Sequence, residues 1–556
     1  MHKRLLMLFQ IIRTNLSAKH TSSGRAPCRH YSGENRVRTA LALCLTVGLG
    51  VGILANCGGS SSVVTNPSKG SLFTFIGDTP LCDVLSSRFT ISGLTVTPLG
   101  GGAQVAIISN SSSFKMNLGG LRDFTTILDL SPVQAGTYDQ AKITISSQQL
   151  GIYNPILSPP TTAIVTRLST STPTFSIAPP LVIASGKISA LEIDYDMIRS
   201  IQLSQAANGS LSASGTPTFQ ASGLTADPNR GFGEMDDLLG FVRSVNTSST
   251  NPTFIGGFVM QFLSGSLPSG AAVTLSYTTD TAVNGQTVCI PCVKGQADCT
   301  SGPNGQFDCS SGPGALNKLL TGNFVEVDGY VDENGNLIAR NVEVEFPEDT
   351  SQNEVALIGL VTSLRKDPNN NLIGFNLWVR QEEPDDGSSV PLDSIVEVDV
   401  SSSTTYQFSS RSANFAYLTF DPTALAVGQE VVVHGPFKLA AIAGTQPTTV
   451  AADKVYLKLQ SMQGNIISLL QAASDDKTGA FQLSPCCTLL QGAPIYVLTN
   501  NQTAFVNVAG LGELNSRSSL LVKGLPFFQP LGGNINGVSV PPGTLVLLAK
   551  QVHQLQ

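Results

Sequence analysis

The stretch Gly240-Phe-Val-Arg-Ser244 recurs as Gly359-Leu-Val-Thr-Ser363 and again as Gly464-Asn-Ile-Ile-Ser468. These three copies decide the fold of the second half of the chain. Their spacing of about one hundred residues is too long for the repeating unit of a solenoid, which has a period of roughly 20–50 residues. Each copy is therefore expected to be a small closed domain that begins with this apolar strand.

A second shared pattern follows each opening. Gly322-Asn-Phe-Val-Glu-Val-Asp-Gly329 parallels Gly428-Gln-Glu-Val-Val-Val-His-Gly435, and Ser519-Leu-Leu-Val-Lys-Gly524 is a shorter third copy in which Arg517 stands where the first glycine would be. Asp332-Glu-Asn-Gly335 is typical of a hairpin turn. We predict three small β-barrels similar to OB folds, because closing a sheet into a barrel removes its exposed edges.

The first half alternates apolar and polar residues, as in Phe89-Thr-Ile-Ser-Gly-Leu-Thr-Val-Thr97 and Lys142-Ile-Thr-Ile-Ser146. This alternation, interrupted by Gly, Pro and Asn, is typical of antiparallel strands with one solvated face. Many short strands at this spacing favour a β-sandwich. One or two helical turns are expected around residues 120–130, where Leu121, Phe124, Ile127 and Leu128 would share a face.

Three stretches of the first half carry a resemblance to a known family: Asp78-Thr-Pro-Leu-Cys-Asp-Val84, Asp123-Phe-Thr-Thr-Ile-Leu128 and Val133-Gln-Ala-Gly-Thr-Tyr138. They resemble bacterial exported lipoproteins catalogued as domain of unknown function 4382. The repeats resemble a second such family, domain of unknown function 5666. The first resemblance implies a β-sandwich similar to transthyretin or carbohydrate-binding modules, and neither resemblance implies an assigned activity.

An export signal is expected at the N-terminus. Arg36-Val37-Arg38 precedes the apolar run Ala40–Ala55, which ends in Leu54-Ala55-Asn56-Cys57 before Gly and Ser residues. A basic flank, an apolar run and then small residues are typical of a secretory signal. The cysteine indicates a lipobox, in which Cys57 is lipidated; Asn56 and the long leader depart from the usual pattern. The alternative is an uncleaved transmembrane anchor, for which the run is short.

These observations divide the chain into consecutive parts. They are a lipoprotein signal peptide over residues 1–57 ending at lipidated Cys57, a flexible tether over 58–70, a β-sandwich over 71–228, barrel repeat 1 over 238–348 with a cysteine-rich loop at 289–314, barrel repeat 2 over 355–460, and a divergent barrel repeat 3 over 461–556.

Composition agrees with an exported β protein. Charged residues make up 13% of the chain, the formal net charge is −7, and there are 53 Gly and 31 Pro. Long surface helices need many charged residues on their solvated face, so few helices are expected. An acidic balance also argues against nucleic acid as a partner.

Cysteines are the most specific local feature. Cys289, Cys292, Cys299 and Cys309 lie in one Gly/Ser-rich loop. A tetrahedral zinc site is one reading, but the gap between the last two is wider than a zinc ribbon uses. In an oxidising compartment disulfides are favoured, with three possible connectivities. Beyond Cys57 the cysteine count is odd, so one thiol is expected to be unpaired or to bridge molecules; the cysteines outside this loop are Cys82, Cys486 and Cys487.

Candidates for a ligand face are fewer. Glu192, Asp194 and Asp196 alternate along one expected strand, as do Glu343 and Glu345. The first group could hold Ca²⁺ or form a carboxylate pair, although a solvated strand face is the plainer reading for both groups. Trp378, the only tryptophan, is expected either in the core or on a ligand face.

We therefore expect no enzymatic activity, no cofactor and no resident metal. Beyond Cys57 the only histidines are His434 and His553, and neither lies near a nucleophile motif. The expected function is a lipid-anchored surface protein with a binding or scaffold role, located in the cell envelope at the outer membrane of a diderm bacterium. Its partners would be the membrane, through the lipid, and a glycan or another envelope protein. The alternatives are an array of carbohydrate-binding modules and a glycan-active hydrolase.

Overall fold

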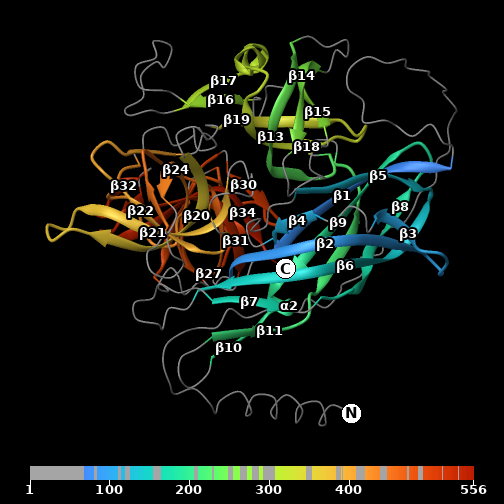
Figure 1. The fold of residues 1–556 in the computed structure, drawn as a ribbon, viewed down its shortest axis with the longest axis horizontal. Coiled ribbons are helices and arrows are strands. Elements are labelled where there is room, and N and C mark those ends of the chain that lie inside the picture. Colours follow the sequence, from blue (N-terminus) through green and yellow to red (C-terminus); the bar gives the residue numbers. More distant parts are fainter. Residues whose placement is uncertain are drawn as a thin grey trace. The chain divides into compact units, whose positions relative to one another are not determined.

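The computed structural model describes a chain built almost entirely from β-strands (Figure 1). The described residues are 68–79, 84–109, 114–118, 126–153, 164–168, 170–205, 211–227, 231–247, 254–262, 272–278, 287–291, 307–345, 354–382, 390, 392–408, 420–438, 448–472, 475–485, 493–501, 503–515, 518–535 and 538–555. Within these ranges no helix is long and apolar enough to cross a membrane. The expected signal peptide and Cys57 lie outside them.

The first sheet follows the order β3-β2-β6-β8-β12-β9-β1-β5. In addition, β4 pairs with β2 and β7 pairs with β6, while β10 and β11 form a separate hairpin. Its elements are β1 (Lys69–Thr79), β2 (Val84–Pro98), β3 (Val105–Ile108), β4 (Phe114–Asn117), β5 (Thr126–Gln134), β6 (Gly136–Ile152), β7 (Ile164–Leu168), β8 (Thr174–Ile183), β9 (Ile188–Asp196), α2 (Met197–Ser200), β10 (Gln202–Gln205), β11 (Leu211–Ser214) and β12 (Phe219–Leu224).

The two halves of this sheet enclose one core. They are joined where β12 meets β8 through a single parallel register pair, Ala221 with Ile177. Phe89 of β2 and Tyr195 of β9 come from opposite halves, yet their ring centroids lie 4.7 Å apart. This arrangement matches the expected sandwich. The helical turns expected around residues 120–130 are wrong for residues 126–130, which belong to β5; Ile127 and Leu128 are buried on a strand whose partner β1 satisfies the backbone.

Three further sheets follow, one for each repeat. The elements of the first are β13 (Glu234–Asn246), β14 (Phe254–Phe262), β15 (Ala272–Thr278), β16 (Thr287–Pro291), β17 (Phe307–Ser311), η2 (Gly312–Lys318), β18 (Phe324–Val331) and β19 (Leu337–Val344). Those of the second are β20 (Glu354–Lys366), β21 (Leu372–Glu382), β22 (Ile395–Asp399), β23 (Thr405–Phe408), β24 (Glu430–Lys438), β25 (Thr449–Ala451) and β26 (Lys454–Leu457). Those of the third are β27 (Gln460–Ala472), β28 (Gly479–Pro485), β29 (Ile495–Thr499), β30 (Ala504–Val506), η5 (Leu511–Glu513), β31 (Ser519–Gln529), β32 (Gly533–Ile535), β33 (Val538–Val540) and β34 (Thr544–Gln554).

The three sheets share one topology. In each, a long opening strand (β13, β20 or β27) lies between the next strand of the chain and the glycine-bearing strand (β18, β24 or β31). A parallel pair then helps to close the sheet: β15 with β19, β22 with β25, and β29 with β34. The expectation of small barrels similar to OB folds is therefore confirmed for the described residues.

The opening stretches carry the same irregularity in every copy. The register with the following strand shifts between Val242 and Ser244, between Val361 and Ser363, and between Ile466 and Ser468. A bulge of this kind bends and twists a strand, which helps a short sheet to close. The bulge explains why the apolar residue and the serine recur at fixed places.

The opening glycine has a steric reason. A Cβ atom on Gly359 would lie 2.1 Å from the carbonyl oxygen of Trp378, and one on Gly240 or Gly464 would lie 2.4 Å from a carbonyl oxygen of the next strand. No real Cβ atom tolerates such a distance to backbone, so only glycine allows the two strands to approach each other at this point.

Candidate functional site

A buried group of carboxylates lies on β18 and β19 of the first repeat. Along β18, Val325 and Val327 point into the barrel core, so Glu326 between them lies on the outer face. Glu343 is its register partner on β19. Glu345 follows β19, and its N–H donates to the carbonyl oxygen of Phe324 over 2.9 Å. Period-two alternation thus gathers three glutamates on one face.

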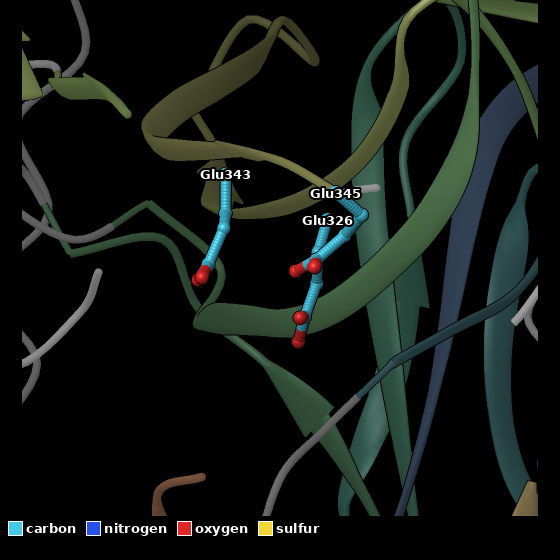
Figure 2. A group of neighbouring side chains, drawn as sticks. All are labelled: Glu326, Glu343 and Glu345. Atoms are coloured by element: carbon cyan, nitrogen blue, oxygen red, sulfur yellow. The ribbon is translucent and has the colours of Figure 1, made fainter. Parts of the chain in front are cut away.

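Glu326, Glu343 and Glu345 form what we call the acidic cluster. Each offers a carboxylate oxygen, and these oxygens all lie within 4.8 Å of one another. Figure 2 shows the three side chains extending to the same side of the strands that carry them. Glu326, Glu343 and Glu345 are only 1%, 3% and 9% exposed to solvent, respectively. The expectation that Glu343 and Glu345 lie on a solvated strand face is therefore wrong.

Cations and an aromatic residue from the later repeats lie against this face. The Lys458 ammonium group is 2.9 Å from Glu326 Oε2, and the two side chains are 11% and 1% exposed. Lys550 Nζ lies 3.8 Å from Asp328 Oδ2 on the same strand as Glu326. Burial, reinforced by the nearby charges of Glu345 and Glu343, raises the pKa of Tyr456 well above its ordinary value. Repeats 2 and 3 therefore contribute the groups that bury the outer face of repeat 1.

The chemistry of the acidic cluster admits two descriptions. Carboxylate oxygens are the ligands that hard divalent cations take in proteins. Among the residues that the structure describes, these three glutamates are the group that could hold such a cation. The Lys458 ammonium group, however, already supplies a positive charge to Glu326 at hydrogen-bonding distance. A buried carboxylate needs such a partner. The geometry fits best with a charged joint between repeats.

A second polar joint connects the sandwich with repeat 2. Arg88 Nε of β2 lies 2.7 Å from Asp393 Oδ2, and Gln149 of β6 donates to the same oxygen over 2.9 Å. Arg380 of β21 is buried; its Nε donates to the carbonyl oxygen of Leu85 and its Nη1 lies 3.1 Å from Glu430 Oε2. These contacts pair opposite charges where the side chains of Asp393 and Arg380 are each only 1% exposed.

Trp378 belongs to this second joint. It is 2% exposed and packs with Leu85 and Tyr153 of the sandwich and with Leu360. A Cβ atom on Gly151 would lie 2.3 Å from its ring, so glycine at this position of β6 leaves room for the indole. Of the two readings of Trp378, the structure places it in a buried contact. Nothing in the sequence indicates that Trp378 packs against the sandwich, or that Gly151 makes room for its ring.

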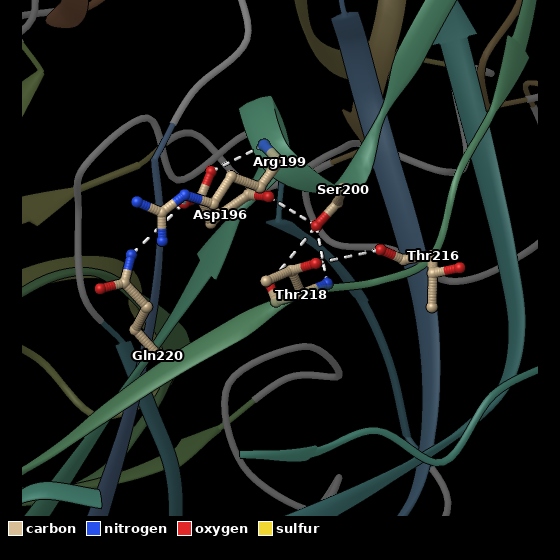
Figure 3. Close-up of polar contacts among 6 residues, drawn as sticks. All are labelled: Asp196, Arg199, Ser200, Thr216, Thr218 and Gln220. Atoms are coloured by element: carbon tan, nitrogen blue, oxygen red, sulfur yellow. Dashed lines mark hydrogen bonds and ion pairs between the residues drawn. The ribbon is translucent and has the colours of Figure 1, made fainter. Parts of the chain in front are cut away.

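The alternating carboxylates of β9 have different surroundings from one another. Asp194 is half-buried and Asp196 is 3% exposed. Figure 3 shows Asp196 at the start of α2, where Oδ1 accepts the N–H of Arg199 over 2.9 Å and Oδ2 lies 3.3 Å from Arg199 Nε and from Gln220 Nε2. Asp196 thus caps a short helical turn. The Arg199 guanidinium group and the Gln220 amide hold the Asp196 carboxylate in place.

His434 also has a structural setting. Its Nδ1 lies 3.2 Å from Asp453 Oδ1 and its Nε2 lies 3.6 Å from Glu354 Oε2. Burial alone would raise the pKa of Asp453, but the hydrogen bond and charge of His434 hold it below its ordinary value. These contacts tie His434 of β24 to Asp453 and to Glu354 of β20.

The cysteines are only partly described. Cys289 lies in β16 and Cys309 in β17, and they are register partners. Cys57, Cys292 and Cys299 lie outside the described residues, as do Cys82, Cys486 and Cys487. Of the residues expected as a possible ligand face, Asp194 and Asp196 lie on β9 and Trp378 lies on β21, with the surroundings given above.

Comparison with known proteins gives one family match. Residues 281–343, within repeat 1, match a family described as "Domain of unknown function (DUF5666)". This confirms the expected resemblance for that segment; the resemblance of the first half to another family remains a prediction. No curated protein matches the chain.

Three solved structures show limited likeness. The single-stranded DNA binding protein of Thermus aquaticus is 15% identical, with 37% of this chain and 93% of that chain covered and a TM-score of 0.14. Its deletion mutant "delta 228-252 R190A" is also 15% identical, with 37% and 94% covered and a TM-score of 0.13. The drosophila structure titled "Unr CSD456" is 8% identical, with 58% and 97% covered and a TM-score of 0.12. Likenesses at these TM-scores carry no argument about this chain.

Proposed function

We propose that the protein is a lipid-anchored component of the bacterial cell envelope, in which the β modules are locked together as a scaffold for binding another envelope component. The observation that carries the scaffold role is the burial of the acidic cluster beneath Lys458 and Tyr456. In an isolated barrel this outer face would be solvated. Three glutamates that face a lysine of another repeat favour a chain whose modules keep fixed neighbours.

The second joint supports the same proposal. Arg88 and Asp393 join the sandwich to repeat 2, and Trp378 packs against Leu85. Removing one partner of a buried charged pair is costly because the other charge is left without compensation. Modules joined in this way would resist independent movement and would present their exposed faces in a constant arrangement.

The two alternatives receive less support. A carbohydrate-binding module usually presents an aromatic ring to the sugar, and the only tryptophan of this chain is buried. A glycosidase needs two carboxylates about 5–9.5 Å apart on either side of the scissile bond. The acidic cluster is tighter than this and buried, and Asp196 is engaged as a helix cap. We therefore propose a non-enzymatic role, with an envelope protein or a glycan as the partner and no nucleic acid.

Small-angle X-ray scattering of the mature chain tests the scaffold. We expect one narrow distribution of the radius of gyration for the wild type. The double variant Lys458→Met, Arg380→Met should broaden that distribution, because it removes a cation from each joint. The control Lys477→Met changes an exposed lysine of repeat 3 and should leave the distribution unchanged. A broad distribution in the wild type would contradict the scaffold.

Metabolic labelling with a palmitate analogue tests the anchor separately. The expected lipidation at Cys57 follows from the apolar run that ends in Leu54-Ala55-Asn56-Cys57. Label should appear in the wild type and be lost in Cys57→Ala. Equal labelling of both proteins would remove the lipid anchor from the proposal without affecting the scaffold.

A further inference from the structure

The β16–β17 hairpin of repeat 1 aligns two cysteines. Its strands pair antiparallel over five consecutive register pairs, with no shift, from Thr287 with Ser311 to Pro291 with Phe307. Cys289 and Cys309 are the central pair. Sequence alone left three connectivities open for the four cysteines of this loop, and the register now distinguishes among them.

We propose that Cys289 and Cys309 form a disulfide bond with each other. Directly opposed residues of an antiparallel pair have Cα atoms about 4.5–5.5 Å apart, and disulfides span Cα separations of about 4.4–6.8 Å. Register partners of this kind therefore meet the Cα separation that a disulfide requires. Cys292 and Cys299 lie outside the described residues; this pairing leaves them to bond to each other or to remain thiols.

The chemistry requires an oxidant. Two thiols lose two electrons and two protons as the S–S bond forms, and a small or protein disulfide takes up both and becomes a dithiol. The oxidising environment of the cell envelope supplies such a disulfide. In the cell, the inference therefore rests on the exported location proposed above.

The position of the hairpin indicates what the bond would stabilise. β17 is the last strand of its sheet and pairs with β16. β16 joins the barrel by only three parallel register pairs with β19, one of which is Cys289 with Glu343. The register row thus runs from Cys309 through Cys289 and Glu343 to Glu326. A disulfide in this row would hold the outermost strand β17 to β16, the strand that pairs with β19 beside Glu343.

Refolding of the full mature chain in a glutathione redox buffer tests the pairing independently of the cell. Free thiols are alkylated, the protein is digested without reduction, and linked peptides are identified by mass spectrometry. We expect Cys289 linked to Cys309. A bond from either residue to Cys292 or Cys299, or both residues recovered as alkylated thiols, would overturn the inference.

Single substitutions sharpen the result. Cys309→Ser should leave Cys289 reactive towards a maleimide after denaturation, whereas the control Cys292→Ser should leave Cys289 and Cys309 unreactive. Reactivity of Cys289 in Cys292→Ser would contradict the pairing. If the refolded chain carries the Cys289–Cys309 bond but protein isolated from cells does not, the pairing stands and the proposed exported location fails.

Discussion

Lys458 is the most informative residue to change, because it is the cation closest to the acidic cluster. Lys458→Met keeps most of the apolar stem but removes an ammonium group that lies 2.9 Å from Glu326 Oε2. At an effective dielectric constant of about 20, the attraction lost is roughly 6 kcal/mol before desolvation is counted. Measured losses for one partner of a buried pair are about 3–5 kcal/mol. We expect the free energy of unfolding to fall by about 4 kcal/mol, towards the middle of this range.

Urea unfolding followed by tryptophan fluorescence measures this change. Trp378 is the only tryptophan and is buried in repeat 2, the repeat that also carries Lys458. Lys477→Met, an exposed position in repeat 3, is the control and should change the free energy of unfolding by less than about 0.5 kcal/mol. Adding Glu326→Gln to Lys458→Met should recover part of the loss, because the uncompensated charge is then removed as well.

The reasoning fails if Lys458→Met unfolds at the same urea concentration as the control. It also fails if the double variant is no more stable than Lys458→Met alone, because the loss would then come from packing of the lysine stem rather than from charge. Both outcomes would also weaken the proposed scaffold.

Three further predictions concern single positions. Gly359→Ala should lower the free energy of unfolding by about 3 kcal/mol in urea, because a Cβ atom there meets a carbonyl oxygen at 2.1 Å; Gly314→Ala, with open space around it, is the control, and equal effects would contradict the steric argument. Burial raises the pKa of Tyr195 from 10.0 in the unfolded chain to about 12 in the folded protein. The stability contributed by its buried neutral hydroxyl is therefore complete below the unfolded pKa and is lost as the pH rises through the folded pKa. The melting temperature should fall between these pH values, and less steeply in Tyr195→Phe; parallel curves would refute this. Asp196→Ala should cost about 1 kcal/mol in thermal unfolding through loss of the helix cap, whereas Asp196→Asn should cost less, and no difference between them would argue against capping.

The sequence alone was sufficient to predict the fold of each repeat. Gly240, Gly359 and Gly464 recur because two strands approach too closely at these points for any Cβ atom. The apolar residue and serine that follow them recur because each opening strand has a bulge there. These are local requirements of strand pairing, so they appear as a local pattern. The helical turns expected over residues 126–130 were wrong, because β1 offers β5 a pairing that short-range periodicity does not encode.

Tertiary structure decided which faces are covered. Alternation assigned Glu343 and Glu345 correctly to the outer side of a strand, but only the packing of Lys458 and Tyr456 against it showed that this side is buried. Trp378 became a buried contact because Gly151, more than two hundred residues earlier in the chain, leaves room for its ring. Period two tells which residues share a face and says nothing of what lies opposite that face. Contacts between distant segments depend on how complete modules pack, and no local pattern records that packing.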